Sequence, residues 1–146
     1  MGLPTAPTPP RYWRGIPQHY RLEAARCVAA GCNEVSFPPR AVCASCGGRE
    51  SVVYPLPREG KLLSFSVLQS APPDFALDPP YAVGLIELSD GTRLTAQVTG
   101  TDLENLHEGM AVRYAFRKVQ QDGEAGTLLY GYKFVPARLP EQGERQ

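Results

Sequence analysis

Residues 51–136 alternate apolar and polar side chains with a period of two, which is typical of half-buried β-strands. Asp90-Gly91 separates two of these runs and is a strong signal for a tight hairpin. The pattern predicts strands over Lys61–Leu68, Tyr81–Leu88, Thr92–Thr99, Ala111–Val119 and Leu128–Val135. Short strands in this number, with one long connection, favour a small closed barrel of the five-stranded type.

Each alternating run also predicts which side chains share one face of its strand. The expected sets are Leu63, Phe65 and Val67; Leu94, Ala96 and Val98; Val112, Tyr114 and Phe116; and Tyr130, Tyr132 and Phe134. At this period the aromatic side chains are most simply interpreted as core or packed strand faces.

The longest connection between the predicted strands is Gln69–Pro80, which holds four prolines. Phe75 and Leu77 lie between the proline pairs, so a stiff loop carries apolar side chains. Two interpretations stay open: these side chains cap the barrel, or they meet a ligand or a partner.

The first 21 residues follow neither strand nor long-helix periodicity. Residues 1–10 hold four prolines and predict a flexible tail. Residues 11–21 are aromatic and basic, and Gly15 and Pro17 limit any helix to one or two short turns. Trp13 and its aromatic neighbours either pack on the module that follows or dock on another subunit, since interface cores favour aromatic residues and arginine.

All four cysteines lie between residues 27 and 46, spaced as Cys-x4-Cys, ten residues, and Cys-x2-Cys. Two close pairs joined by a short loop suit one tetrahedral metal ion. The sequence therefore predicts structural Zn²⁺ on Cys27, Cys32, Cys43 and Cys46, because four protein thiolates leave no open position for water. An iron centre on the same ligands stays open as an alternative. So small a module needs the metal for its stability.

The predicted fold class is mainly β: a short N-terminal helical segment, a zinc ribbon, and a small five-stranded barrel of OB type. The predicted organisation is a flexible tail (1–10), an aromatic and basic docking segment (11–21), the zinc ribbon (22–50), the OB-fold domain (51–138) and a second flexible tail (139–146).

Charge and hydropathy narrow the classes of partner. The formal net charge is zero, but residues 1–50 carry six arginines against three glutamates, and the remainder is net acidic. Neither part is the strongly basic footprint of a nucleic-acid binder. No apolar run reaches a membrane-spanning length, and the N-terminus lacks the regions of a signal peptide, so we expect reduced cysteines and a cytoplasmic protein.

Catalytic motifs are missing from the sequence. Its two histidines, His19 and His107, have no nucleophile or carboxylate at a recognisable spacing. All cysteines are assigned to the metal. We therefore expect the chain to be non-catalytic on its own.

Five motifs in order resemble the DUF35 family, in which a rubredoxin-like zinc ribbon is joined to an OB-fold. They are the segment Trp13–Leu22, Phe37-Pro38-Pro39-Arg40, Cys43-x-x-Cys46-Gly47, the strand Gly60–Val67 and the closing Tyr130–Pro136. The resemblance covers about residues 11–136. The chain departs from the family at Cys27 and Cys32, which have four residues between them where the family usually has two.

The resemblance implies a small accessory subunit of a thiolase-type complex, similar to those of the archaeal acetoacetyl-CoA thiolase assembly and of benzoylsuccinyl-CoA thiolase. Such a subunit scaffolds the enzyme and helps shape the site for a CoA thioester. Arginines for phosphates and an apolar loop for the pantetheine arm fit that role. The residues predicted to bind partner or substrate are Trp13, Arg14, Tyr20, Arg21, Arg40 and Phe75.

Three alternatives remain: an accessory subunit of an acyl-CoA hydratase or aldolase, a nucleic-acid-binding module, and an independent acyl-CoA-binding protein or small enzyme. Zinc ribbons and OB-folds both occur in nucleic-acid binders, whose grooves combine positive charge with aromatic stacking. The acidic balance of the barrel half argues against that role.

Overall fold

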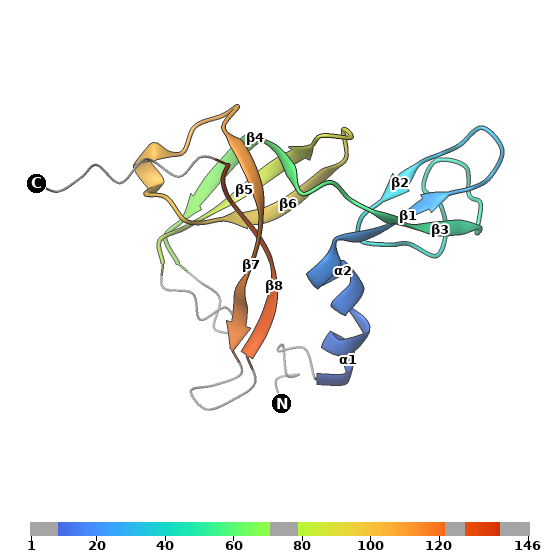
Figure 1. Ribbon diagram of the computed structural model, residues 1–146, viewed down its shortest axis with the longest axis horizontal. Helices are drawn as coiled ribbons and strands as arrows, with labels where there is room; N and C mark the ends of the chain where they lie inside the picture. Colours follow the sequence, from blue (N-terminus) through green and yellow to red (C-terminus); the bar gives the residue numbers. More distant parts are fainter. Residues whose placement is uncertain (1–8, 71–78, 122–127, 138–146) are drawn as a thin grey trace, which may run out of the picture. The chain divides into compact units, whose positions relative to one another are not determined.

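The computed structural model describes residues 9–70, 79–121 and 128–137. The chain divides into two compact units, Met1–Pro57 and Arg58–Gln146, which we call the ribbon unit and the barrel unit. The described chain is mainly β, as predicted (Figure 1). No helix among the described residues has the length and apolar character needed to cross a membrane.

The ribbon unit begins with two short helices and continues with a three-stranded antiparallel sheet of order β2-β1-β3. Gly15 interrupts the helical segment, as the sequence predicts. Few apolar side chains of this unit are buried: Leu22, Ala24, Ala25, Cys27 and Leu56. The elements are α1 (Pro9–Arg14), α2 (Ile16–Arg21), β1 (Glu23–Cys27), β2 (Val35–Ser36) and β3 (Ser51–Pro55).

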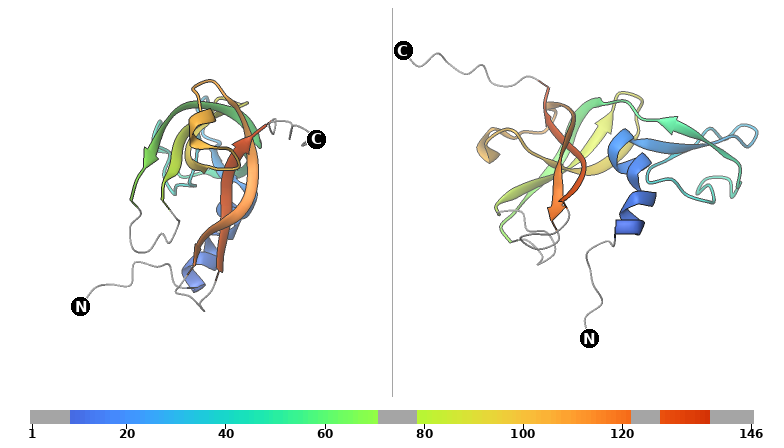
Figure 2. Two further views of the ribbon diagram at one scale, coloured as in Figure 1. Left: turned by 90° about the vertical axis from the view of Figure 1, so that its left-hand side faces the viewer. Right: turned by 60° about the horizontal axis from the view of Figure 1, so that its bottom comes forward.

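The barrel unit is a closed five-stranded barrel of order β4-β5-β6-β8-β7. Its strands curve around a common centre in the views of Figure 2, and the predicted OB-type barrel is confirmed. Among the strands that the structure describes, only β6 and β8 pair in parallel. The elements are β4 (Glu59–Leu68), β5 (Tyr81–Leu88), β6 (Arg93–Val98), the 3₁₀ turn η1 (Leu103–Asn105), β7 (Ala111–Gln121) and β8 (Leu128–Pro136).

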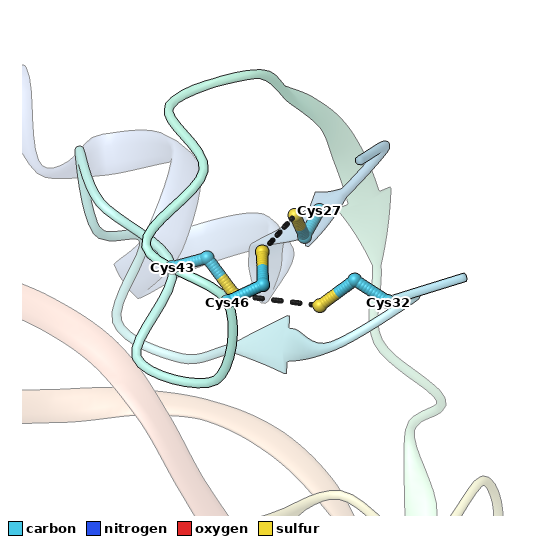
Figure 3. A group of neighbouring side chains, drawn as sticks. All are labelled: Cys27, Cys32, Cys43 and Cys46. Carbon is cyan, nitrogen blue, oxygen red and sulfur yellow. Dashed lines mark hydrogen bonds between the residues drawn. The ribbon is translucent and has the colours of Figure 1, made fainter. Parts of the chain in front are cut away.

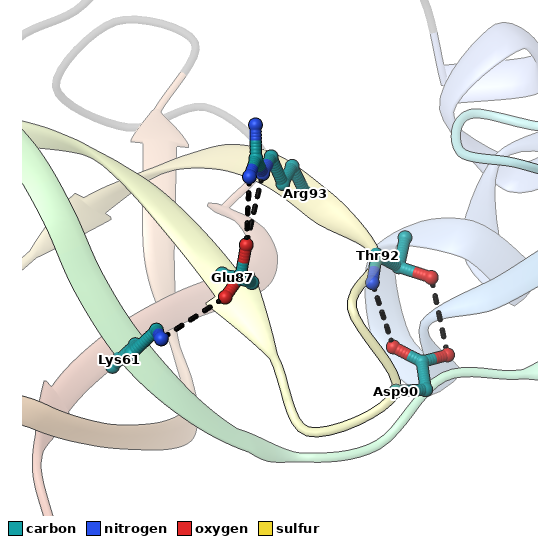
Figure 4. Close-up of polar contacts among 5 residues, drawn as sticks. All are labelled: Lys61, Glu87, Asp90, Thr92 and Arg93. Carbon is teal, nitrogen blue, oxygen red and sulfur yellow. Dashed lines mark hydrogen bonds and ion pairs between the residues drawn. The ribbon is translucent and has the colours of Figure 1, made fainter.

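The predicted hairpin at Asp90-Gly91 joins β5 to β6. Gly91 adopts a φ of +85°, which glycine reaches without steric cost. Both carboxylate oxygens of Asp90 accept hydrogen bonds from Thr92, one from its amide at 3.0 Å and one from its hydroxyl at 3.1 Å (Figure 4). Local chemistry therefore closes this turn.

The barrel core is formed by inward-facing side chains of all five strands. Leu62, Ile86, Val112 and Phe134 are fully buried, and the predicted set Leu94, Ala96 and Val98 is buried with them. Leu62 joins the core because the register between β4 and β5 shifts between Leu62 and Ser64. Leu63, Phe65 and Val67 are half-buried and alternate with exposed serines, which agrees with the predicted shared face.

Two of the aromatic side chains predicted to lie in the core or on packed strand faces are partly exposed. Phe116 is 41% and Tyr130 36% exposed, and their rings stack on each other with centroids 5.3 Å apart. The reason is strand length: β7 pairs with β4 only near its start, and β6 meets β8 only at Val98 and Phe134. Beyond those contacts β7 and β8 pair only with each other among the described strands, so their alternating faces are not enclosed.

Candidate metal centre

The first cysteine pair lies in a tight connection that leaves β1. Cys27 ends β1, and its amide donates to the carbonyl oxygen of Glu34 at 2.9 Å. The amide of Cys32 donates to the carbonyl oxygen of Ala29 at 3.0 Å, which closes a turn between the two cysteines. Gly31 takes a φ of +77° within it. The four-residue spacing is thus accommodated by one additional turn.

The second pair lies in a knuckle closed by its own backbone. The amide of Cys43 donates to the carbonyl oxygen of Gly48 at 2.8 Å. The amide of Gly47 donates to the carbonyl oxygen of Cys43 at 3.0 Å. The paired glycines have different reasons to be there. Gly47 takes a φ of +73°, whereas a Cβ on Gly48 would lie 3.2 Å from the Sγ of Cys46. Gly47 supplies the conformation and Gly48 leaves room for the sulfur.

The four sulfur atoms converge on one point (Figure 3). The Sγ atoms of Cys27 and Cys46 are 3.6 Å apart, and so are those of Cys32 and Cys43. All four lie within 4.8 Å of one another. A zinc ion bound at about 2.3 Å to four sulfurs separates them by about 3.8 Å. The two pairs therefore bring the sulfurs to nearly tetrahedral spacing.

The thiol pKa values differ across the cluster. The amides of Cys46 and Ser45 donate to the Cys43 sulfur and lower its pKa to about 7. The amide of Ala29 lowers the pKa of Cys27, but burial and the neighbouring thiols outweigh it and raise that pKa to about 12. A metal ion binds thiolates and displaces these protons, and Cys43 ionises more readily than Cys27.

The donor set fits zinc. The group contains four thiols and no histidine or carboxylate, which is the ligand chemistry of a closed tetrahedral site. Cys27 is buried, Cys32 and Cys43 are half-buried and Cys46 is exposed, so the cluster lies at the edge of the small ribbon core. An ion held by all four thiolates would have no ligand position left for substrate.

The other predicted site residues differ in their exposure and contacts. Trp13 is 77% exposed, whereas Tyr20 is half-buried with its ring edge-on to Tyr12. Arg21 donates to the carboxylate of Glu23 at 2.6 Å. Arg14 and Arg40 are exposed, and Phe75 lies outside the described residues.

A shallow apolar groove on the ribbon unit brings Trp13 and Arg14 together with residues that the sequence analysis missed. One part of it is lined by Pro10, Trp13, Arg14, Ile16 and Pro17. The adjoining part shares Arg14 and Pro17 and continues to Val52 and Val53 of β3. Val52 is 51% and Val53 70% exposed, and β3 is an edge strand of the described sheet. The signal that the sequence analysis missed is this pair of consecutive valines, because neighbouring residues of a strand face opposite sides and both are exposed here.

The sequence and the fold both match known proteins. Residues 14–52 match the rubredoxin-like zinc ribbon domain of ChsH2, and residues 53–117 match its C-terminal OB-fold domain. Among solved structures, a chain of the "Ltp2-ChsH2(DUF35) aldolase" superposes with a TM-score of 0.68 at 28% identity, covering 94% of this chain and 100% of that one.

Two relatives describe the family further. The benzoylsuccinyl-CoA thiolase subunit BbsA of Thauera aromatica is 38% identical over 79 residues, which is 54% of this chain and 52% of that subunit. A DUF35 domain-containing scaffold protein of Methanocaldococcus jannaschii is 39% identical over 127 residues, or 86% of this chain and 89% of that protein. With such similarity on both modules, the resemblance seen in the sequence is confirmed, and the chain belongs to the DUF35 family.

Proposed function

We propose that this chain is a non-catalytic, zinc-binding accessory subunit that scaffolds a thiolase-type enzyme. The main support is its similarity to scaffold proteins across 86% of its length. A second relative is itself named as a thiolase subunit. In this role the chain binds an enzyme and stabilises the assembly, and the reaction takes place on the partner.

In this proposal Zn²⁺ is held by Cys27, Cys32, Cys43 and Cys46 and has a structural role. When bound, the ion supplies a cross-link that fixes the two knuckles against each other. The ribbon needs it because the buried apolar side chains of that unit are few and mostly small. The folded ribbon then presents the groove and the helical segment to the partner.

The docking surface we assign is the apolar groove around Trp13, Arg14, Val52 and Val53. Interface cores are enriched in tryptophan and arginine, and an exposed tryptophan beside a groove is a typical anchor. The unpaired edge of β3 adds backbone donors and acceptors. A groove of this kind suits a partner that inserts apolar side chains.

Capture of the tagged full-length chain from its native cells tests the proposal. We expect a thiolase-like protein in near-equal amount, and about one zinc per chain. Trp13→Ala should lose that protein while keeping its zinc. Val42→Ser is the matched control, because Val42 is 45% exposed on the ribbon but lies outside the groove. Equal capture by both variants would contradict docking at the groove.

The finer proposal is that the subunit helps to shape the CoA-thioester site of the complex. Arg14 and Arg40 are exposed and take part in none of the ion pairs described, whereas Arg21 is held by Glu23. Within the complex, Arg40→Gln should raise the Michaelis constant for the acyl-CoA with unchanged assembly. Arg14→Gln lies at the docking groove and should weaken assembly as well. Arg93→Gln, on the barrel, is the control.

A second candidate is an accessory subunit of an acyl-CoA aldolase or hydratase. It is favoured by the 28% identity to the chain in the ChsH2 aldolase structure. A 32% identical relative, named as a probable enoyl-CoA hydratase alpha subunit of Thermomonospora curvata, points the same way. Mass spectrometry of the captured partner distinguishes these reactions.

A further inference from the structure

Lys133 of β8 is buried to an extent that is unusual for a lysine. Its relative exposure is 8%, and among the described residues only Gln120 is another buried polar side chain. Lysine is almost never buried unless an acidic group pairs with it. A cation in such a position therefore needs an explanation.

No carboxylate explains it among the described residues. The ion pairs there join Arg21 to Glu23, and Lys61 and Arg93 to Glu87. The charges that act on Lys133 are instead positive, from Lys118 and Arg117 of the neighbouring β7. The local field is thus electropositive, and the ammonium group is left without a described anion.

The ammonium group is not sealed inside the barrel. Among the described side chains, only the hydroxyl of Tyr12 is both enclosed and without a hydrogen-bond partner. Lys133 also lines a pocket of about 340 Å³ that belongs entirely to the barrel unit. Its polar head therefore has open space in front of it.

The topology builds this pocket from β5, β6 and β8, which are neighbours in the barrel (Figure 1). At its wall the chain leaves β6 through Thr99, Gly100 and Thr101, and Gly100 takes a φ of +81°. The amide of Thr99 donates to the carbonyl oxygen of Phe134 at 2.9 Å, which fixes this turn beside β8. Other lining residues are Tyr81, Gln97, Asp102 and Leu103.

The chemistry of the lining favours an oxyanion. The ammonium group of Lys133, two threonine hydroxyls, a tyrosine hydroxyl and the amide of Gln97 are all able to donate. Charge-assisted hydrogen bonds of this kind are the strong ones. Asp102 is the one acidic side chain of the lining, but it is exposed and is not among the groups that shift Lys133. We propose that this pocket binds the phosphoryl group of a small molecule, with Lys133 as its principal charged contact.

A bound anion would change the titration of Lys133. Burial, then the charges of Lys118 and Arg117, lower its pKa. The negative charge of a bound phosphate beside the ammonium group would raise that pKa. The apolar part of the lining, Tyr81 and Leu103, leaves room for an organic group next to the phosphate.

The test uses the full, zinc-loaded chain and two probes, inorganic phosphate and phenyl phosphate, with acetate as a control anion. NMR of the lysine Cε signals should show a saturable shift of Lys133 and a rise in its pKa. Tighter binding of phenyl phosphate assigns the site to phosphate esters, and equal binding assigns it to free phosphate. Both results support a phosphoryl site. No saturable shift with either probe, or an equal response to acetate, would overturn the proposal.

Substitution separates binding from folding. Lys133→Met removes an unpaired buried charge, so we expect a melting temperature that is unchanged or higher and at least tenfold weaker phosphate binding. Lys61→Met, an exposed lysine on the same unit, should bind phosphate normally. Thr99→Val should weaken binding without altering the melting temperature. A folded Lys133→Met protein that binds phosphate like the parent would refute the assignment.

Discussion

The ribbon unit and the barrel unit achieve stability in different ways. The ribbon buries Leu22 and Leu56 with a few alanines, and it gathers four thiols at its edge. The barrel buries larger side chains from all five strands, including Phe134, Leu62 and Ile86. A unit that buries too little apolar surface needs another source of stability, such as a bound metal ion. The two units should therefore respond to opposite kinds of perturbation.

The largest effect should come from breaking the metal centre. Cys43→Ser, or a strong chelator on the parent chain, should remove zinc and unfold the ribbon, because structural zinc contributes roughly 10–16 kcal/mol in small zinc modules. Barrel signals in an amide NMR spectrum should persist, since that unit has its own core. Zinc content is measured on the same samples.

Ser45→Ala is the matched control for this change, because Ser45 is an exposed residue of the same knuckle. It should keep its zinc and its ribbon spectrum. A Cys43→Ser protein with full zinc content and intact ribbon signals would show that the four thiols are not one site.

The next largest effect should come from the barrel core. The side chain of Phe134 is fully buried, with 0% of its surface exposed to solvent. Phe134→Ala should therefore lower the free energy of unfolding of the barrel by about 3–5 kcal/mol. Zinc content should not change. Phe116→Ala removes a ring that is 41% exposed and should cost well under half as much in urea unfolding. Equal losses would mean that the two rings are equally enclosed.

A smaller effect should separate the two glycines of the second knuckle. Gly47→Ala places a side chain at a φ of +73°, which costs about 1–2 kcal/mol. Gly48→Ala instead presses on the sulfur of Cys46 and should speed zinc release to a chromophoric chelator. Gly91→Ala imposes similar strain in the barrel, at a φ of +85°, and should leave the release rate unchanged. Identical release rates for all three variants would contradict these separate roles.

The smallest effect should come from the surface ion pairs of the barrel. Glu87 lies between Lys61 at 3.1 Å and Arg93 at 3.0 Å (Figure 4). Hydrogen bonds from Lys61 and then Arg93 lower its pKa. The stability it contributes is therefore present above the unfolded pKa of about 4.3 and is lost as pH falls through the lower folded value. Glu87→Gln should show a slightly lower melting temperature near neutral pH, and the difference should vanish in high salt and in acid.

Local patterns were sufficient for much of this molecule. The spacing of Cys27, Cys32, Cys43 and Cys46 predicted one site because each pair closes within a few residues. Asp90-Gly91 predicted its hairpin for the same reason. Alternation predicted the strands of the barrel, since the side-chain period belongs to each strand by itself.

Long-range pairing decided the remainder. Alternation could not show where the barrel stops enclosing β7 and β8, which left Phe116 and Tyr130 at the surface. Nor could it assign β3 to the ribbon sheet, because its pairing with β1 joins residues far apart in the sequence. The groove beside Val52 and Val53 therefore came only from the structure.

By itself, the sequence predicted the four cysteines as one cluster, the mainly β fold class and the family, because these depend on residue type and short spacing. The tertiary structure decided which side chains are enclosed, and Lys133 is the clearest case. In its strand it is one polar residue in an alternating run, and it is buried beside residues of β5 and β6 that are distant in the sequence. The burial of a side chain depends on which distant segments the topology places next to it, and a local sequence pattern does not contain that information.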